Sequence, residues 1–216
     1  EDGLAALVAK SLLVRREGDK GESRYAMLET MREFALAKLG EQGQRAMWQR
    51  RHAEYFAAGA DVVSTNSFGG SLLKLAGHGL GDRTYELNLA AARLAREIAP
   101  AGRYVAGSMG PTGKFLKPQG EFTEEDFAAA YAEQARGLAD GGTDVLLIET
   151  QYDLREALAA VRGARSVCAL PVFVTMTFNS FPRGFFTLMG DTVVKSAAEL
   201  EKEGVGAVGA NCTLNS

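Results

Sequence analysis

The chain has 216 residues, of which 46% are hydrophobic and 24% charged, and this composition excludes wholesale disorder. Its net charge of −3 provides no general attraction for nucleic acid or for an anionic membrane surface. No apolar run reaches the roughly 18 residues that a membrane span needs. The chain has two cysteines, which excludes a disulfide scaffold and predicts a reducing compartment, the cytoplasm. Because the chain starts at Glu1 rather than Met, we expect it to be a piece of a longer protein.

The first 58 residues predict a small α+β segment with the element order of a winged helix. A helix is expected over residues 4–10, and two strands are expected over 11–16 and 24–28. A polar, glycine-containing turn joins the strands and makes them a hairpin. Apolar residues at helical spacing predict two further helices, over 31–39 and 42–57.

This segment resembles a known family in three stretches: 4–13 (LAALVAKSLL), 25–35 (YAMLETMREFA) and 50–56 (RRHAEYF). They are similar to the winged-helix segment that follows the nucleotide-binding core of bacterial signalling ATPases acting as transcriptional regulators. The resemblance implies a regulatory or interaction module, which we keep as an alternative function. Four arginines could form a DNA-facing patch, but a solvated surface is the favoured interpretation of Arg15, Arg16, Arg50 and Arg51.

From residue 59 onward, short β-rich runs alternate with alanine-rich helical runs. Strands are predicted over 61–64, 104–108, 144–149, 171–177 and 205–211. The helices between them are predicted over 83–98, from Thr123, over 153–166 and over 191–203, with Asp153 and Glu156 at capping-box spacing and Asp191 as a cap. Strands that are apolar on both faces indicate a parallel sheet covered by helices. Periodicity alone leaves open a doubly wound sheet and part of an eight-stranded barrel.

Small or polar residues follow the carboxyl end of every predicted strand. The clusters are 65–67 (TNS), 107–111 (GSMGP), 149–150 (ET), 175–177 (TMT) and 211–212 (NC). In a parallel barrel these ends converge on one face, which is where active sites lie. Each cluster alone is ordinary turn chemistry. Five in succession, including a carboxylate and a thiol, favour a functional site.

Five stretches from this part resemble the homocysteine S-methyltransferase family, which includes the homocysteine-binding domain of cobalamin-dependent methionine synthase. They are 58–70 (AGADVVSTNSFGG), 105–113 (VAGSMGPTG), 144–150 (DVLLIET), 171–178 (PVFVTMTF) and 208–212 (VGANC). The resemblance implies that residues 59–216 form an incomplete homocysteine-binding (β/α)8 TIM barrel with about strands 2–6. The predicted domains are therefore a winged-helix-like segment, 1–58, and this partial barrel, 59–216.

The resemblance implies an enzyme that transfers a methyl group to the homocysteine thiolate and so forms methionine. In the family three cysteine thiolates hold a zinc ion that binds the substrate sulfur, and Cys212 matches one of these ligands. Glu149 matches the residue that receives the substrate amino group. Four further residues match strand-end positions that line the substrate pocket: Asn66, Ser108, Thr177 and Asn211. The implied partners are homocysteine and a methyl donor, with methylcobalamin on another domain as one candidate.

The sequence also departs from the family pattern. The adjacent cysteine pair that completes the zinc site is absent, and so are the first, seventh and eighth barrel strands. Cys168 is expected to be structural, and His52 and His78 to be surface or capping residues. One cysteine does not make a tetrahedral zinc site, so we expect the chain by itself to lack methyl-transfer activity. An incomplete barrel also predicts two unpaired sheet edges, which favour aggregation or swapping.

The junction between the two resemblances lies near residues 51–59, where the sequence fits both families. A true fusion and a recombination or assembly artefact both remain open. A dinucleotide-binding or phosphate-loop enzyme is disfavoured, because no Gly-x-Gly-x-x-Gly follows a predicted strand and no Gly-Lys-Ser/Thr loop is present.

Overall fold

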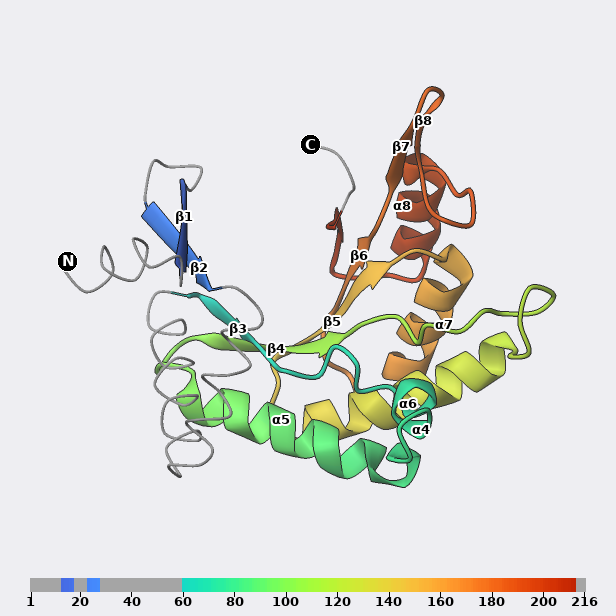
Figure 1. Ribbon diagram of the computed structural model, residues 1–216. Coiled ribbons are helices and arrows are strands. Elements are labelled where there is room, and N and C mark those ends of the chain that lie inside the picture. The colour runs from blue at the N-terminus through green and yellow to red at the C-terminus, as the bar shows by residue number, and fades with distance from the viewer. Residues whose placement is uncertain (1–12, 18–22, 28–59, 213–216) are drawn as a thin grey trace. The chain divides into compact units, whose positions relative to one another are not determined.

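The computed structural model describes residues 13–17, 23–27 and 60–212 (Figure 1). The chain divides into two compact units, Glu1–Tyr55 and Phe56–Ser216. In the first unit, β1 (Leu13–Glu17) and β2 (Ser23–Met27) pair in antiparallel fashion. This confirms the predicted hairpin. The helices predicted over 4–10, 31–39 and 42–57 lie outside the described residues, as does His52.

The second unit is built on a parallel sheet whose strand order is β3-β4-β5-β6-β9. Its strands are β3 (Val62–Ser64), β4 (Tyr104–Met109), β5 (Val145–Gln151), β6 (Val172–Met176) and β9 (Ala207–Ala210). Each strand lies beside the next parallel strand in the chain, and the order never reverses. A doubly wound sheet reverses its strand order at a switch point, so this alternative is excluded for the described sheet. The arrangement is that of consecutive barrel strands, and the described residues do not close a barrel.

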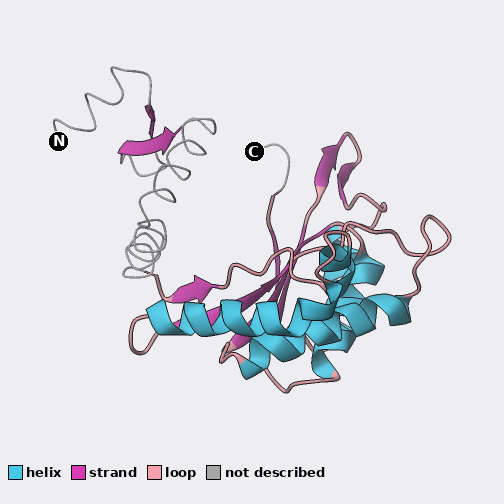
Figure 2. Cartoon of the chain, turned by 60° about the horizontal axis from the view of Figure 1, so that its bottom comes forward, coloured by secondary structure: helices cyan, strands magenta, loops and turns pink. Residues whose placement is uncertain are grey.

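The helices lie on one side of this sheet, as Figure 2 shows. The four longer ones are α5 (Thr84–Ile98), α6 (Glu124–Asp140), α7 (Leu154–Arg165) and α8 (Val193–Lys202). Within the described residues, no helix is long and apolar enough to cross a membrane. Because every crossover returns on the same side, the opposite face of the sheet carries no helix from this part of the chain.

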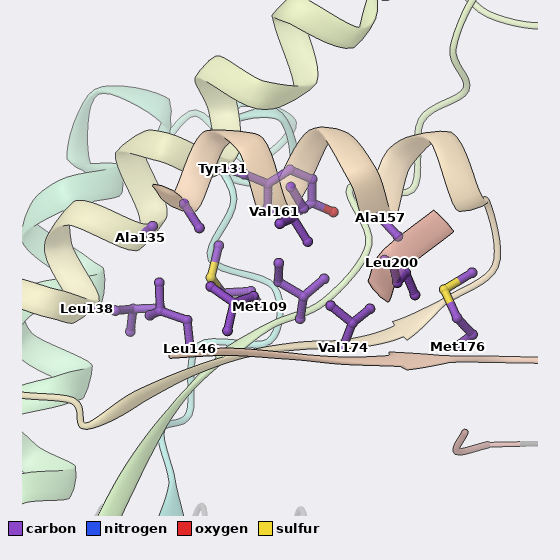
Figure 3. Packing of buried hydrophobic residues seen from close by; sticks show 14 of the residues in the cluster. Met109, Tyr131, Ala135, Leu138, Leu146, Ala157, Val161, Val174, Met176 and Leu200 are labelled. Carbon is purple, nitrogen blue, oxygen red and sulfur yellow. The ribbon is translucent and has the colours of Figure 1, made fainter. Parts of the chain in front are cut away.

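The hydrophobic core fills the space between the helices and the sheet (Figure 3). Leu146 of β5 lies beside Leu138 of α6, whereas Val174 of β6 points toward α7, and all three side chains are buried. Strand alternation sends the intervening side chains to the other face. There Tyr104 is 61% exposed and Phe173 38% exposed. In a closed barrel this face is the interior, and it is also the face of Ser108 and Glu149.

The first residues of α6 and α7 can be compared with the capping residues predicted from the sequence. α6 begins after Thr123, as predicted, and Thr123 caps it through a reciprocal capping box with Asp126 that the sequence prediction did not include. Asp153 caps α7 by accepting a hydrogen bond from the backbone of Arg155, but the capping box expected with Glu156 is wrong. The Glu156 carboxylate instead accepts hydrogen bonds from Thr112 and Tyr131, which lie outside α7.

The predicted cap of α8 is also wrong. Thr192, not Asp191, caps this helix, and its side chain accepts from the Lys195 backbone. The carboxylate of Asp191 pairs with Lys195 Nζ at 2.6 Å, one turn along, which leaves the cap position to the next residue.

Four short elements are absent from the sequence prediction. They are α4 (Leu72–Ala76), the single 3-10 turn η1 (Gly81–Arg83), and the hairpin of β7 (Asn179–Phe181) and β8 (Gly184–Phe186). Runs of three to five residues are too short for a periodic pattern to identify them.

Candidate functional site

The candidate site begins with a direct contact between two neighbouring strands. Ser108 Oγ in β4 donates a hydrogen bond to Glu149 Oε1 in β5 at 2.5 Å. Ser108 is 2% exposed, whereas Glu149 is half-buried. Hydrogen bonds to a carboxylate are stronger than those between neutral groups. The structure therefore brings together two of the predicted residues, 41 positions apart in the sequence.

A β-bulge turns the chain directly at Glu149. The pairing of β5 with β6 shifts between Ile148 and Gln151, so Glu149 and Thr150 together lie opposite Thr175. Thr150 has a φ of 63°, which is unusual for a β-branched residue. Its backbone N–H donates to Thr175 Oγ1 at 3.1 Å. Bulges of this kind change the direction of side chains and are frequent beside active sites.

A second cluster joins the ends of β5, β6 and β9. Asn211 Nδ2 donates to Thr150 Oγ1 at 2.8 Å, and Thr177 Oγ1 donates to the Asn211 carbonyl oxygen at 3.2 Å. Asn211 Oδ1 is buried and has no hydrogen-bond partner among the described residues. The predicted residues Thr177 and Asn211 are therefore in contact, and Thr150 connects them to the strand that carries Glu149.

Cys212 follows Asn211 at the end of β9. It is exposed, its thiol is free, and its φ is 51°. Cys168 lies after α7, where its Sγ contacts the Ala164 carbonyl oxygen at 3.5 Å. Among residues 60–212 and the two described hairpin strands, no group of three or more His, Cys, Asp or Glu side chains could hold a metal ion. The described donor set therefore does not fit the three-cysteine zinc site that the family resemblance implies.

Asn66 is the predicted site residue that lies apart from these contacts. It is exposed and lines a cavity of about 330 Å³ together with Phe68 and Asn88. Its two neighbours in the chain make the contacts with β4 instead. Ser67 Oγ donates to the Ser108 carbonyl oxygen at 2.7 Å, and Thr65 Oγ1 accepts from the Ser108 backbone N–H at 2.9 Å.

The sequence prediction missed the residues that support the site. Thr65, Ser67, Thr150 and Thr175 lie in the quoted strand-end clusters, but nothing local distinguishes them from their neighbours. In a strand, alternate side chains point to opposite faces, and this alternation is the signal that could have distinguished these residues from their neighbours. The buried helical residues Tyr131, Gln134 and Glu156 give only a weak signal, a polar group on an otherwise apolar helix face.

A larger cavity lies away from these residues, at the β7–β8 hairpin. It measures about 430 Å³ and is lined by residues including Phe181, Arg183 and Phe186. No predicted site residue lines it. The described strand ends and this cavity are therefore separate features of the second unit.

Comparison with known proteins finds relatives of this chain. The sequence model of the homocysteine S-methyltransferase family matches residues 22–216. The methionine synthase of Mycobacterium leprae is 37% identical over 172 residues, and that of Mycobacterium tuberculosis is 36% identical over the same length. In each case the match covers 74% of this chain and 14% of the relative, so the chain spans only a small part of their length.

Solved structures show the same fold. The homocysteine methyltransferase MmuM from Escherichia coli, in its oxidized form, matches with a TM-score of 0.63 and 23% identity. The match covers 83% of this chain and 66% of that one. Its apo form matches with a TM-score of 0.57 over 76% of this chain and 60% of that one, again at 23% identity.

Proposed function

Because the chain belongs to the homocysteine S-methyltransferase family, we propose that it binds homocysteine as the acceptor in the methyl transfer that forms methionine. The Ser108–Glu149 contact carries this proposal. It places a half-buried carboxylate at the carboxyl ends of parallel strands, on the face that carries no helix. Ligand sites in parallel α/β folds lie at this end of the strands.

Glu149 receives the ammonium group of homocysteine in this proposal. The Ser108 hydroxyl holds Oε1, which leaves Oε2 to meet the substrate. Because an ammonium group is a hydrogen-bond donor and a cation, it forms a charge-assisted hydrogen bond with the carboxylate. Thr177 and Asn211 line the adjoining part of the pocket, and the unpartnered Asn211 Oδ1 supplies a further acceptor. Asn66 contributes from the loop after β3.

Methyl transfer needs the substrate sulfur as a thiolate, because the thiolate is the nucleophile. We propose Cys212 as a catalytic residue and as one ligand of the zinc that the family uses for this purpose. The described residues provide no second and third ligand beside it. The proposed activity of this chain by itself is therefore acceptor binding without methyl transfer. The methyl donor is supplied by a further domain or partner, with methylcobalamin as the proposed group, and the proposed location is the cytoplasm.

Calorimetric titration of the reduced chain with homocysteine tests the proposal. N-acetylhomocysteine is the matched ligand, because it keeps the thiol and the carboxylate but lacks the ammonium group. We expect Glu149→Gln to weaken homocysteine binding at least tenfold, which is about 1.4 kcal/mol and close to the range for a hydrogen bond to a charged group. N-acetylhomocysteine should bind weakly to the wild type and to Glu149→Gln alike.

Glu125→Gln is the control, because Glu125 is exposed in the first turn of α6 and should leave affinity unchanged. Equal affinity of the wild-type chain for the two ligands would remove the role of Glu149. Absence of any homocysteine binding to the folded wild-type chain would overturn the proposed function.

A further inference from the structure

A buried carboxylate lies on the helix side of the sheet, behind the candidate site. Glu156, in the first turn of α7, is 0% exposed. Its Oε1 accepts hydrogen bonds from the Thr112 backbone N–H at 2.7 Å and from Thr112 Oγ1 at 2.9 Å. The Tyr131 hydroxyl lies 2.8 Å from the same oxygen. Three groups from two other segments thus converge on one atom.

Tyr131 extends this network to two strand ends. It is also 0% exposed, and Figure 3 shows it between α6 and the sheet. Its hydroxyl lies 3.1 Å from the Gly110 carbonyl oxygen and accepts a hydrogen bond from Gln151 Nε2 at 3.3 Å. Gln151 ends β5, two residues after Glu149. Gly110 follows β4, two residues after Ser108.

The turn after β4 is therefore held from two sides. On the helix side, Tyr131 and Glu156 contact its residues Gly110 and Thr112. On the other side, the Gly110 backbone N–H donates to the Phe68 carbonyl oxygen at 2.9 Å. A Cβ at Gly110 would lie 2.6 Å from the Phe68 ring, so the turn packs closely on the loop after β3. A glycine-rich turn needs such contacts to hold one conformation.

Keeping a carboxyl group in this position is costly for the fold. Desolvation raises the pKa of Glu156, although the hydrogen bonds from Thr112 and Tyr131 act in the opposite direction. Glu156 Oε2 is buried and has no partner among the described residues. A buried carboxyl group with one oxygen left without a hydrogen bond does not by itself stabilise a fold. The carboxyl group is better explained by what it holds in place.

We propose that Glu156 and Tyr131 are positioning residues that fix the turn after β4, and thereby keep Ser108 in contact with Glu149 so that Glu149 meets the substrate ammonium. This inference rests on the proposed function. The network is on the opposite side of the sheet from the substrate, so neither residue touches it. Their effect reaches the site through the two-residue connections from Gly110 to Ser108 and from Gln151 to Glu149.

The test compares Glu156→Ala with Glu156→Gln. The alanine variant loses the acceptor oxygen, whereas the glutamine variant keeps it and should restore most of the wild-type behaviour. The first readout is hydrogen exchange of the amides of Gly110, Thr112 and Gly113, which needs no ligand. We expect exchange to become at least tenfold faster in Glu156→Ala and to remain near the wild-type rate in Glu156→Gln.

The second readout is the ratio of the dissociation constants for N-acetylhomocysteine and homocysteine. We expect this ratio to fall at least threefold in Glu156→Ala, because a misplaced Glu149 no longer favours the free ammonium group. A merely structural role would reduce the active fraction and leave the ratio unchanged. If Glu156→Ala does not fold, Tyr131→Phe makes the same test, because it removes the contacts with Gly110 and Glu156. Tyr85→Phe is the matched control, since its hydroxyl donates to Asp140 at an exposed site.

The outcomes separate the two proposals. Unchanged exchange at Gly110, Thr112 and Gly113, or an unchanged ratio in a folded variant, overturns the positioning role while the proposed function stands. Failure of the wild-type chain to bind homocysteine overturns the proposed function and, with it, the link from the turn to substrate binding. In that case the exchange measurement still decides whether Glu156 and Tyr131 hold the turn.

Discussion

Backbone strain in the described part of the chain is concentrated at two non-glycine residues, Thr150 and Cys212, with φ angles of 63° and 51°. Both adjoin residues that the sequence assigns to the site, Glu149 and Asn211. A left-handed conformation costs a residue with a Cβ about 1–2 kcal/mol. Such conformations persist only where surrounding contacts hold them, and they cluster at functional sites. Here the Thr150 side chain is held by the hydrogen bond from Asn211 Nδ2.

Replacing Thr150 tests this strain. Thr150→Gly and Thr150→Ala both lose the hydroxyl, so the pair differs only in the Cβ. We expect the glycine variant to be more stable by about 0.5–1 kcal/mol, because relief of strain exceeds the entropic cost of glycine. Urea denaturation measures the difference. At exposed, helical Glu125 the order should be reversed, with alanine the more stable. A less stable glycine variant at residue 150 would mean that the position carries no strain.

At the scale of elements, glycines allow neighbouring helices to approach closely. A Cβ at Gly137 in α6 would lie 2.6 Å from the Tyr85 carbonyl oxygen in α5. A Cβ at Gly163 in α7 would lie 2.2 Å from the Ala128 carbonyl oxygen in α6. Glycine inside a helix costs about 1 kcal/mol relative to alanine, so these positions oppose local propensity. The sequence identifies α6 and α7 by their apolar spacing, but their separation depends on packing.

Gly163→Ala tests this close contact. Alanine is the better helix former, yet we expect the variant to lower the free energy of unfolding by about 1–3 kcal/mol, because the added methyl group overlaps the backbone of α6. Urea denaturation again measures the change. Ala129→Gly is the control on the exposed side of α6 and should cost about 1 kcal/mol through propensity alone. An equally stable or more stable Gly163→Ala would show that the helices move apart freely.

At the scale of the whole molecule, the chain offers few of the cysteine and histidine side chains that zinc sites use most. It contains two cysteines and two histidines in all. Cys212 ends β9, whereas Cys168 follows α7 and His78 is exposed in the loop between α4 and η1. Within the described sheet, β3 pairs only with β4, and β9 pairs only with β6. Cys212 thus follows a strand that has one neighbour in this part of the chain.

Elemental analysis of the zinc-reconstituted chain tests the metal prediction. We expect well under one zinc per chain in the wild type, because a structural or catalytic zinc site needs three or four protein ligands. Cys212→Ser and the matched variant Cys168→Ser should give the same value. Near one zinc per chain, lost in Cys212→Ser but kept in Cys168→Ser, would contradict the prediction. That result would mean that other groups or a second copy complete the site.

Some predictions remain untested at this scale. The family match begins at residue 22, inside the segment predicted as a winged helix, so the domain boundary at residues 58 and 59 stays a prediction. The regulatory role suggested for residues 1–58 also stays a prediction. The two readings of the junction, fusion or artefact, are distinguished by amplification of genomic DNA across codons 45–65.

The sequence by itself determined the strands and longer helices of the second unit, the β1–β2 hairpin, the Thr123 cap and the family. These features depend on periodicity, on side chains within a few residues, or on whole motifs. Only the tertiary structure decided that the strand order never reverses and that Ser108 meets Glu149. It also showed that Glu156 bonds Thr112 rather than its own helix start. Thr112 and Glu156 are 44 positions apart, and such a contact depends on how helices and strands pack together, which no local pattern records.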